Sequence, residues 1–275
     1  MPLGKFLVLS YAISPVHVGA GRAPGAVDLP IQRDNIGYPI IFASSFKGVL
    51  KSSLLLDSNK DKMAKCLFGS EPEDQNKEMG RLVITDLIPV FYPIASVSEG
   101  YVYITTEYLL NRARDILEVL NYPESNLWSV DSSTGGKKEV SVLMDTVEYK
   151  STLTLKKDVK DIGKLVKDKV YVFDDNAGLQ FIESSIIRVY RNVLKDETKI
   201  ADNLWAEEYL PHGTILIGGI IDGQRSNSLC SGINEEDMLK ELNNLMVVQV
   251  GGRESIGKGV LKLKVIGNGK QKITS

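Results

Sequence analysis

The sequence has few of the residues that most metal sites and many nucleophilic sites need. It holds two cysteines and two histidines, Cys66, Cys230, His17 and His212, among 275 residues. It has no CxxC pair, and so few ligands make a four-ligand structural zinc site hard to assemble. Two isolated cysteines in a chain of this size favour a reducing, intracellular setting.

The chain also lacks an apparent membrane segment and an excess of basic charge. The apolar run near Met1 is short, alternates with polar residues and breaks at Ser14-Pro15, so we expect neither a signal peptide nor a membrane span. We predict a cytoplasmic protein. The formal net charge is −2, whereas a free-standing nucleic-acid binder is usually basic. Any contact with nucleic acid must therefore come from local patches, backbone amides or neighbouring subunits.

The composition is that of a globular chain. Apolar residues make up 43% and charged residues 25%, which is enough for a sizeable core. Strands and helices without regular alternation predict an α+β fold, best matched by a split β-α-β core of the ferredoxin or RNA-recognition type with long insertions. We expect strands at 6–13, 81–90, 140–149, 169–173, 212–222, 247–250 and 260–266, and helices at 46–56, 108–120, 159–167, 176–187 and 235–245.

Residues 14–43 are too rich in glycine and proline for a regular element, and a loop this long is usually functional. Asp28 lies within it, beside Pro30. The default reading of such a residue is a local turn hydrogen bond. A carboxylate here can also act in acid–base chemistry or hold a hard cation, if other parts of the fold supply partners. His17 is structural, solvent-exposed or part of a site.

Two further motifs point to anion binding. Ser44 and Ser45 are expected to cap the next helix, with Lys47 one turn in. Ser44-x-x-Lys47 also has the spacing of a serine acyl-enzyme, but the companion motifs are missing. Near the other end, Gly252 to Lys258 matches seven places of a phosphate loop. Gly259 stands where Ser or Thr should reach magnesium, so we reject nucleotide hydrolysis and keep either an anion-binding loop or a simple tight turn.

These segments together are more specific than any one of them. They resemble the N-terminal signature and the C-terminal glycine-rich loop of the RAMP superfamily of CRISPR proteins. Asp28–Arg33 and the later Leu204–Pro211 look like the repeated backbone subunit of type III-B (Cmr) effectors. The similarity spans most of the chain and is weak between about 60 and 180. The N-terminal signature comprises His17–Gly21, Val27–Arg33, Gly37–Ile40 and Ser44–Gly48, and the loop is Gly251–Gly259.

The resemblance implies an organisation for the chain. We expect a single RAMP domain over 1–275, with an RNA-recognition-like palm and with finger and thumb insertions. The long functional loop would be 14–43, an irregular inserted region about 57–187 and the thumb hairpin about 188–211. Copies of the chain would stack into a helical filament along a CRISPR guide RNA, beside other Cmr subunits and without a membrane.

The resemblance also implies an activity. Each thumb would flip out one nucleotide of the guide–target duplex, and the aspartate of the N-terminal loop would cut the target there. Asp28 falls at that position, with Glu207 and Tyr209 as candidate catalytic partners. Asp28 would deprotonate the 2′-hydroxyl of RNA, or weakly hold a divalent ion, Mg or Mn. The products would carry 2′,3′-cyclic phosphate ends.

Guide binding without sequence preference needs phosphate contacts. The matching positions predict RNA-binding roles, and no role is assigned to His212. The predicted RNA-binding residues are His17, Arg33, Ser44, Ser45, Lys47, Lys51, Gly251, Gly252, Arg253, Gly257 and Lys258.

Three functions stay open at this point. The first is a guide-binding backbone subunit that is also a target-RNA endonuclease, cutting at regular intervals. The second is a purely structural guide-binding subunit in which Asp28 takes no part. The third is a guide-processing RNase of the same superfamily, although such enzymes usually use histidine or other local acid–base groups and this chain has two histidines.

Overall fold

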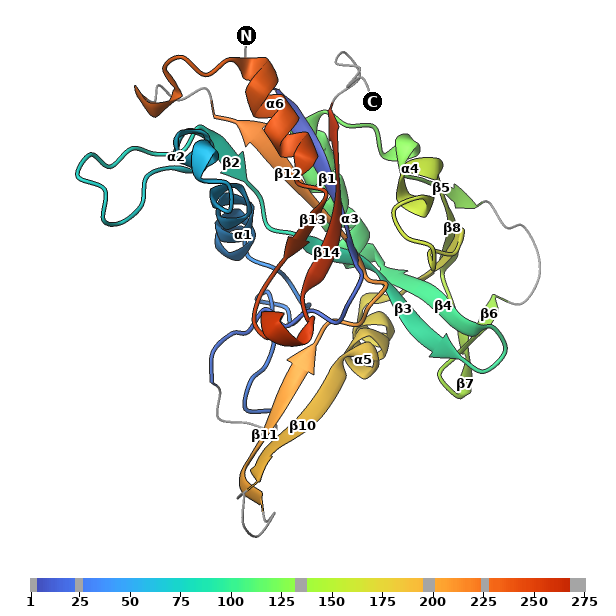
Figure 1. The fold of residues 1–275 in the computed structure, drawn as a ribbon. Helices are drawn as coiled ribbons and strands as arrows, with labels where there is room; N and C mark the ends of the chain where they lie inside the picture. The colour runs from blue at the N-terminus through green and yellow to red at the C-terminus, as the bar shows by residue number, and fades with distance from the viewer. Residues whose placement is uncertain (1–3, 23–26, 132–137, 195–200, 224–227, 268–275) are drawn as a thin grey trace.

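The computed structural model describes residues 4–22, 27–131, 138–194, 201–223 and 228–267 (Figure 1). Its main feature is one large mixed sheet. The strands of this sheet are β1 (Lys5–Ala12), β2 (Leu82–Ile84), β3 (Ile88–Ser96), β4 (Gly100–Thr106), β5 (Trp128–Asp131), β8 (Ser151–Leu155), β9 (Lys169–Phe173), β12 (Ile215–Asp222), β13 (Val247–Gln249) and β14 (Val260–Gly267).

The sheet places the first and last of the described strands, β1 and β14, side by side. Its order is β13-β14-β1-β12-β3-β4-β9-β8-β5, and β2 pairs with β12 outside this path. β1 is antiparallel to both β12 and β14, whereas β4 and β9 run parallel. Seven of the eight residues of β1 are buried, which is typical of a strand covered on both faces. This mixed sheet, together with the helices described next, confirms the α+β prediction.

The helices pack around this sheet. α3 lies against β1, β12 and β3, while α6 contacts β14 and α5 contacts β3, β4 and β9. None of the described helices is long and apolar enough to cross a membrane. The α-helices are α1 (Ala43–Leu55), α2 (Asp61–Phe68), α3 (Glu107–Leu120), α4 (Lys157–Lys160), α5 (Asp175–Ser185) and α6 (Glu235–Asn244), and the short 3-10 helices are η1 (Ser58–Lys60), η2 (Glu124–Asn126), η3 (Ser228–Cys230) and η4 (Glu254–Ile256).

The start of α1 differs from the prediction. Ser44 and Ser45 were expected to cap it, but the helix begins at Ala43 and its N-cap is Phe42, which makes no side-chain cap. The cap comes from a distant segment instead, because the backbone N–H of Ala43 donates to Asp86 Oδ1 at 2.7 Å. Local sequence could not show this partner, so the capping prediction was wrong.

Two predicted elements are shorter or divided. The strand expected at 81–90 splits into β2 and β3, because Thr85 bonds Gly219 while Leu87 turns to pair with Ile41. The helix expected at 159–167 is reduced to the single turn of α4. Gly163 lies against the ring of Tyr11, where even a Cβ would come within 2.4 Å of a ring carbon, and this packing leads the chain out of the helix.

The region between 57 and 187 is more regular than predicted. It contains α2, β4, β5 and β8, none of which the sequence pattern indicated. The strand expected at 140–149 is a hairpin of β6 (Glu139–Val142) and β7 (Asp145–Glu148). Leu143 has a left-handed φ of 56° between them. The predicted helices at 108–120 and 176–187 and the strand at 169–173 are confirmed by α3, α5 and β9.

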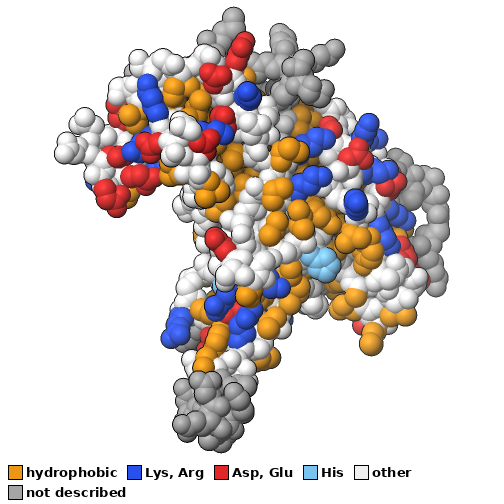
Figure 2. All heavy atoms as spheres, viewed as in Figure 1, with side chains coloured by type: hydrophobic (Ala, Val, Ile, Leu, Met, Phe, Trp, Pro, Cys, Tyr) orange, Lys and Arg blue, Asp and Glu red, His pale blue; other side chains and the backbone are white. Residues whose placement is uncertain are grey.

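The hairpin predicted at 188–211 is present as β10 (Ile187–Leu194) and β11 (Ala201–Tyr209). It forms its own two-stranded sheet and projects from the rest of the chain (Figure 1). Lys and Arg side chains gather where it joins the main body (Figure 2). Residues 195–200, between the two strands, lie outside the described residues.

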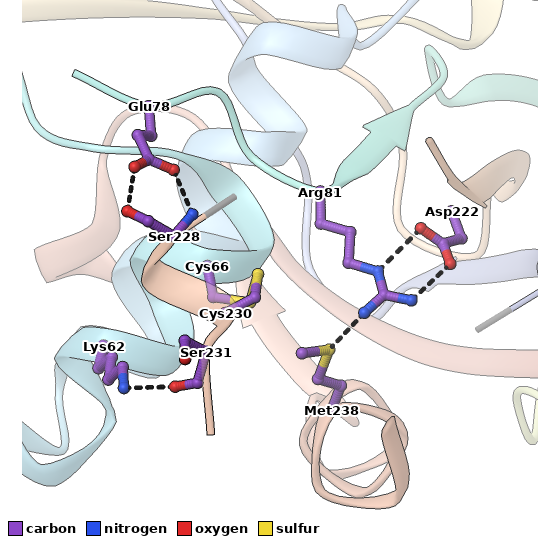
Figure 3. Close-up of a disulfide and its surroundings, with 9 residues drawn as sticks. All are labelled: Lys62, Cys66, Glu78, Arg81, Asp222, Ser228, Cys230, Ser231 and Met238. Atoms are coloured by element: carbon purple, nitrogen blue, oxygen red, sulfur yellow. Dashed lines mark hydrogen bonds and ion pairs between the residues drawn. A yellow bond between two sulfur atoms is a disulfide. The ribbon is translucent and has the colours of Figure 1, made fainter. Parts of the chain in front are cut away.

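A disulfide ties α2 to η3, which contradicts the expectation of two isolated cysteines. Cys66 on α2 is bonded to Cys230, 164 residues further on. Two contacts reinforce this junction (Figure 3): Lys62 Nζ donates to the Ser231 carbonyl at 2.6 Å, and the Ser228 N–H donates to Glu78 at 2.7 Å. The pairing needs α2 and η3 side by side, so spacing alone could not reveal it.

Breaking this disulfide is expected to lower the stability of the chain. A cross-link over a loop this long is expected to stabilise by about 2–5 kcal/mol, chiefly by restricting the unfolded state. Cys66→Ser should therefore unfold at a lower denaturant concentration than the oxidised wild type. Dithiothreitol should shift the wild type toward the variant and leave the variant unchanged. A wild type that unfolds identically in both redox states, with free thiols confirmed by titration, would contradict the account.

Candidate functional site

The N-terminal loop is held along the base of the hairpin. The Leu29 N–H donates to the Ala206 carbonyl at 3.0 Å, and the Glu208 N–H donates to the Leu29 carbonyl at 3.1 Å. Asp28 adds a side-chain contact, since its Oδ2 accepts from the Ala206 N–H at 2.8 Å. Asp28 is therefore an exposed carboxylate fixed to β11, and not only a turn-forming residue.

A solvent-open pocket of about 530 Å³ lies beside Asp28. Both ends of the chain contribute to it, because Arg22 comes from the N-terminal loop and Arg253 from the C-terminal one. The hairpin supplies Asn203 and Trp205. One carboxylate, two guanidinium groups and an indole thus share one cavity. This combination can accept a proton, neutralise a phosphate and contact a base.

Strand alternation places the two glutamates of β11 on opposite faces of the hairpin. Glu207 shares a face with Trp205 and Tyr209, whereas Glu208 faces the other way. Glu208 lies opposite Arg188 on β10, and its carboxylate accepts a hydrogen bond from Arg188 Nε at 3.2 Å. The same carboxylate accepts from Arg33 at 3.1 Å. Glu208 therefore fastens the hairpin to the N-terminal loop.

Glu207 is fully buried and surrounded by donors. Trp205 Nε1 donates to it at 2.6 Å and Arg191 Nε at 2.9 Å, while the Tyr209 hydroxyl and Arg253 Nη2 also contact it. Burial raises the pKa of this carboxyl, but the bonds from Tyr209, Trp205 and Arg253 outweigh that effect and lower its pKa to about 2. Glu207 is thus ionised and has its oxygens occupied at neutral pH.

Acid should remove the stability that Glu207 supplies. An unfolded glutamate titrates near 4.5 and the folded one near 2, so the unfolded state binds more protons in this window. Stability is fully present above about pH 4.5 and falls as pH drops toward 2. In denaturant melts, the difference in unfolding free energy between wild type and Glu207→Gln should shrink as the pH falls from about 4.5 toward 2. A difference independent of pH would contradict the assignment.

Tyr209 lies beneath the pocket and not at its surface. Its side chain is fully buried, and burial together with the bond to Glu207 raises the pKa of its hydroxyl. Lys258 Nζ lies 5.5 Å from the centre of its ring, within the range of a cation–π contact. The centres of the His17 and Tyr209 rings lie 5.3 Å apart, with the ring planes tilted by 52°. Tyr209 therefore supports Glu207 and Lys258 from below.

His17 is enclosed where the two terminal loops meet. It is 7% exposed, and its Nδ1 lies 2.7 Å from the Glu208 carbonyl oxygen. Since that oxygen only accepts, Nδ1 carries the proton. The Gly252 N–H donates to the His17 carbonyl at 2.9 Å. The structure thus places His17 as a packing and orienting group, and its predicted contact with RNA stays a prediction.

The C-terminal glycine loop needs glycine at two places for steric reasons. Gly251 has a φ of +84°, and a Cβ there would lie 2.1 Å from the His17 carbonyl oxygen. Gly259 has a φ of +78°, and its Cβ would lie 2.0 Å from the Val250 carbonyl oxygen. The close approach at Gly251, together with the bond that the Gly259 N–H donates to the Pro15 carbonyl at 2.9 Å, holds the loop against residues 15–18 of the N-terminal segment. The two glycine loops are therefore in direct contact.

The predicted RNA-binding residues of α1 lie apart from the Asp28 pocket. Ser44 is exposed, and Ser45 Oγ accepts from Gln32 at 3.4 Å. Lys51 forms an ion pair with Glu71 at 2.7 Å, and Arg33 is committed to Glu183 and Glu208. Arg33 and Lys51 would have to exchange these partners to bind phosphate. Their RNA contacts, like those of Ser44, Ser45 and Lys47, stay predictions.

The residues around Asp28 do not form a metal site of their own. No group of three or more His, Cys, Asp or Glu side chains that could hold an ion occurs in the described part of the chain. Glu207 is occupied by its donors, and the arginines of the pocket repel a cation. The donor set therefore does not fit an ion held by this chain alone.

Sequence reasoning missed Arg22, Asn203, Trp205 and Arg191. Period-two alternation along β11 could have found Trp205, because it puts residues 205, 207 and 209 on one face. Arg191 is opposite Trp205 across the hairpin, a pairing that depends on strand register. No sequence pattern indicates Arg22, because its position in the pocket depends on the path of the N-terminal loop.

Known proteins are similar to this chain over nearly its whole length. "CRISPR system Cmr endoribonuclease Cmr4" of Pyrococcus furiosus is 28% identical over 94% of each chain. "CRISPR system CMR subunit Cmr4" of Saccharolobus solfataricus is 26% identical over 92% of this chain and 94% of that one.

A chain in the cryo-EM structure of the Type III-B Cmr-beta complex bound to cognate target RNA is also similar. It is 28% identical, the match covers 95% of this chain and 96% of that one, and the TM-score is 0.74. The family model of the RAMP superfamily matches residues 11–262. This protein therefore belongs to the RAMP superfamily.

Proposed function

We propose that this chain is a guide-RNA-binding backbone subunit of a type III-B CRISPR effector, and that it cleaves complementary target RNA at Asp28. The observation that carries the proposal is the placing of Asp28, an exposed carboxylate bonded to Ala206 at the base of the hairpin, in a pocket with Arg22 and Arg253. The relatives named Cmr4, one of them an endoribonuclease, support the same reading.

The chemistry follows from RNA and from one carboxylate. Oδ2 of Asp28 is held by the Ala206 N–H, and among the described residues Oδ1 has no hydrogen-bond donor. We infer that Asp28 takes the proton of a 2′-hydroxyl whose oxygen bonds to the adjacent phosphorus. The P–O5′ bond breaks, and the leaving oxygen takes a proton from water. The products are a 2′,3′-cyclic phosphate and a 5′-hydroxyl.

Metal dependence is a separate part of the proposal. A loosely held Mg or Mn ion would find one carboxylate, Asp28, with the RNA phosphates and water as its other ligands. The free chain should then bind no divalent ion tightly, while cleavage in the complex would respond to chelation. None of the steps described above is assigned to this ion.

The guide would lie over the palm. We propose that β1, α1, β2, β12, α6 and β14 form an RNA-recognition-like β-α-β-β-α-β unit, because β14, β1, β12 and β2 are neighbours in this order. The glycine loop and the first turns of α1 would hold guide phosphates, using Ser44, Ser45, Lys47 and Lys258. The hairpin would act as the thumb that separates one nucleotide from the guide–target duplex.

The proposed partners follow from this role. They are the CRISPR guide RNA, complementary target RNA, further copies of this chain in a filament and other Cmr subunits. A filament subunit needs one basic groove while its other faces meet proteins, which fits a net charge of −2. We place the complex in the cytoplasm. A disulfide is rare there, although intracellular proteins of hyperthermophiles contain them.

The test is cleavage by the assembled complex. A complex with a defined guide should cut complementary RNA at regular intervals and leave an unrelated RNA intact. Binding of both guide and target without any cut would favour a purely structural subunit. Maturation of a precursor guide by the isolated chain would instead support a guide-processing RNase.

A further inference from the structure

We propose that Arg253 is a catalytic residue of target cleavage that binds the scissile phosphate, and that Glu207 is the positioning residue that holds it there. This inference rests on the proposed function and deepens it. It moves Arg253 from the guide-binding loop, where sequence alone places it, to the target side of the site. It also removes Glu207 from the candidate acids and bases.

The first observation concerns Glu207. Its side chain is fully buried and accepts from Trp205, Arg191, Tyr209 and Arg253. A general base needs a free oxygen within reach of its proton, and a general acid needs a proton to give. This carboxylate has neither, because its oxygens are filled and the pKa is far below neutral. Its chemistry is therefore orientation of its donors.

The second observation concerns the path of the backbone at Arg253. Its φ is +69°, in the left-handed region where residues with a Cβ are strained. In the described chain, Asn121 and Leu143 are the other non-glycine residues with positive φ. Two glycines precede Arg253, so a third would suit the backbone better. A residue kept in this conformation points to a use for its side chain.

The third observation is the direction of that side chain. Arg253 lines the same pocket as Asp28, and its side chain is 37% exposed. Glu207 engages Nη2, and an arginine has five N–H donors. The remaining donors can face a ligand. The ion pair thus fixes one side of the guanidinium and leaves the rest available to the pocket.

The chemistry needs such a group. As the 2′-oxygen bonds to phosphorus and the bond to O5′ lengthens, negative charge grows on the two non-bridging oxygens. A planar guanidinium can donate to both, and a preorganised donor does so without reorganisation. Asp28 cannot stabilise this charge, because it is itself an anion before it accepts the proton. Arg253 supplies the opposite charge in the same cavity.

The experiment uses the reconstituted complex with its guide and measures single-turnover cleavage at saturating target. Arg253→Ala should slow cleavage at least about 100-fold, the scale for loss of one oxyanion donor. Guide and target affinity should change less than about threefold. Arg253→Lys should recover part of the rate, since a point charge replaces a bidentate donor. The matched control is Arg114→Ala, which removes a similarly exposed, ion-paired arginine of α3 that does not line the Asp28 pocket, and it should stay within threefold of wild type.

Glu207 is tested through Arg253. Glu207→Gln keeps the volume of the side chain and should slow cleavage about tenfold. The double variant Arg253→Ala/Glu207→Gln should be no slower than Arg253→Ala, because Glu207 acts through that residue. Thermal melts of each complex exclude misfolding as the cause. If the double variant slowed cleavage by the product of the two single effects, Glu207 would act independently of Arg253, and this result would overturn the positioning role.

Two outcomes separate this inference from the function beneath it. If Asp28→Asn abolishes cleavage while Arg253→Ala cuts at the wild-type rate, Arg253 is not catalytic and the proposed function survives. If Arg253→Ala loses guide binding but cleaves each bound target at the wild-type rate, Arg253 contacts the guide RNA and not the scissile phosphate. If Asp28→Asn cuts normally, the proposed cleavage site itself is wrong.

Discussion

Asp28→Asn is expected to slow target cleavage by about 10²- to 10⁴-fold, the usual contribution of a positioned general base. Asn keeps an oxygen that can accept from the Ala206 N–H, so the loop should stay on β11. What disappears is the charge and the ability to take a proton. Single-turnover cleavage in the assembled complex measures the loss, with guide and target binding expected to be unchanged.

Asp28→Ala provides the comparison. It removes both the charge and the contact with Ala206, so it should match Asn in cleavage and be less stable than Asn. If Ala alone impaired cleavage while Asn cut normally, Asp28 would be needed for holding the loop and not for proton transfer. Asp34→Asn, which alters a carboxylate of the same loop that faces Arg112 and Tyr108, is the control for charge removal.

Gly251→Ala is expected to have the next largest effect, on both stability and activity. Its new Cβ would lie 2.1 Å from the His17 carbonyl oxygen in a conformation of positive φ. Strain and overpacking together should cost at least about 3 kcal/mol. The loop must move away from residues 15–18, and Arg253 moves with it. We expect a lower melting temperature and at least about tenfold slower cleavage.

The loop itself offers a matched control. Gly257 also has positive φ, +73°, but a Cβ there meets nothing within 4 Å. Gly257→Ala should thus show the conformational strain alone, about 1–2 kcal/mol. Equal destabilisation by both substitutions would mean that close packing of the two glycine loops contributes nothing, and would contradict the geometry described for this site.

The hydrophobic pattern predicted those strands and helices whose own sequence carries a clear periodicity. The runs that became β1, α3, β9 and α6 carry their own periodicity, so their existence and type were evident. The cap of α1 was predicted wrongly because Asp86 supplies it from another segment. α4 is shorter than expected because Gly163 packs against Tyr11. Both errors arise where distant parts of the chain decide a local conformation.

At the candidate site too, the sequence predicted some features, and contacts between distant segments decided the others. The resemblance pointed to Asp28, Glu207 and Tyr209, and the structure brings all three to the base of the hairpin. Sequence could not tell which of them is exposed. The register of β10 and β11 buries Glu207 under two arginines and leaves Asp28 open to solvent. The two carboxylates thus differ in exposure and in the number of hydrogen bonds that they accept, and the proposal gives them different roles for this reason.

The measurement that tests the central claim most directly is a map of the cut positions on complementary RNA, with identification of the new ends. The wild-type complex should give evenly spaced cuts with 2′,3′-cyclic phosphate ends, and the Asp28→Asn complex should bind the same RNA and leave it whole. Cuts that persist in the Asp28→Asn complex, or that show no regular spacing in the wild type, would contradict the account.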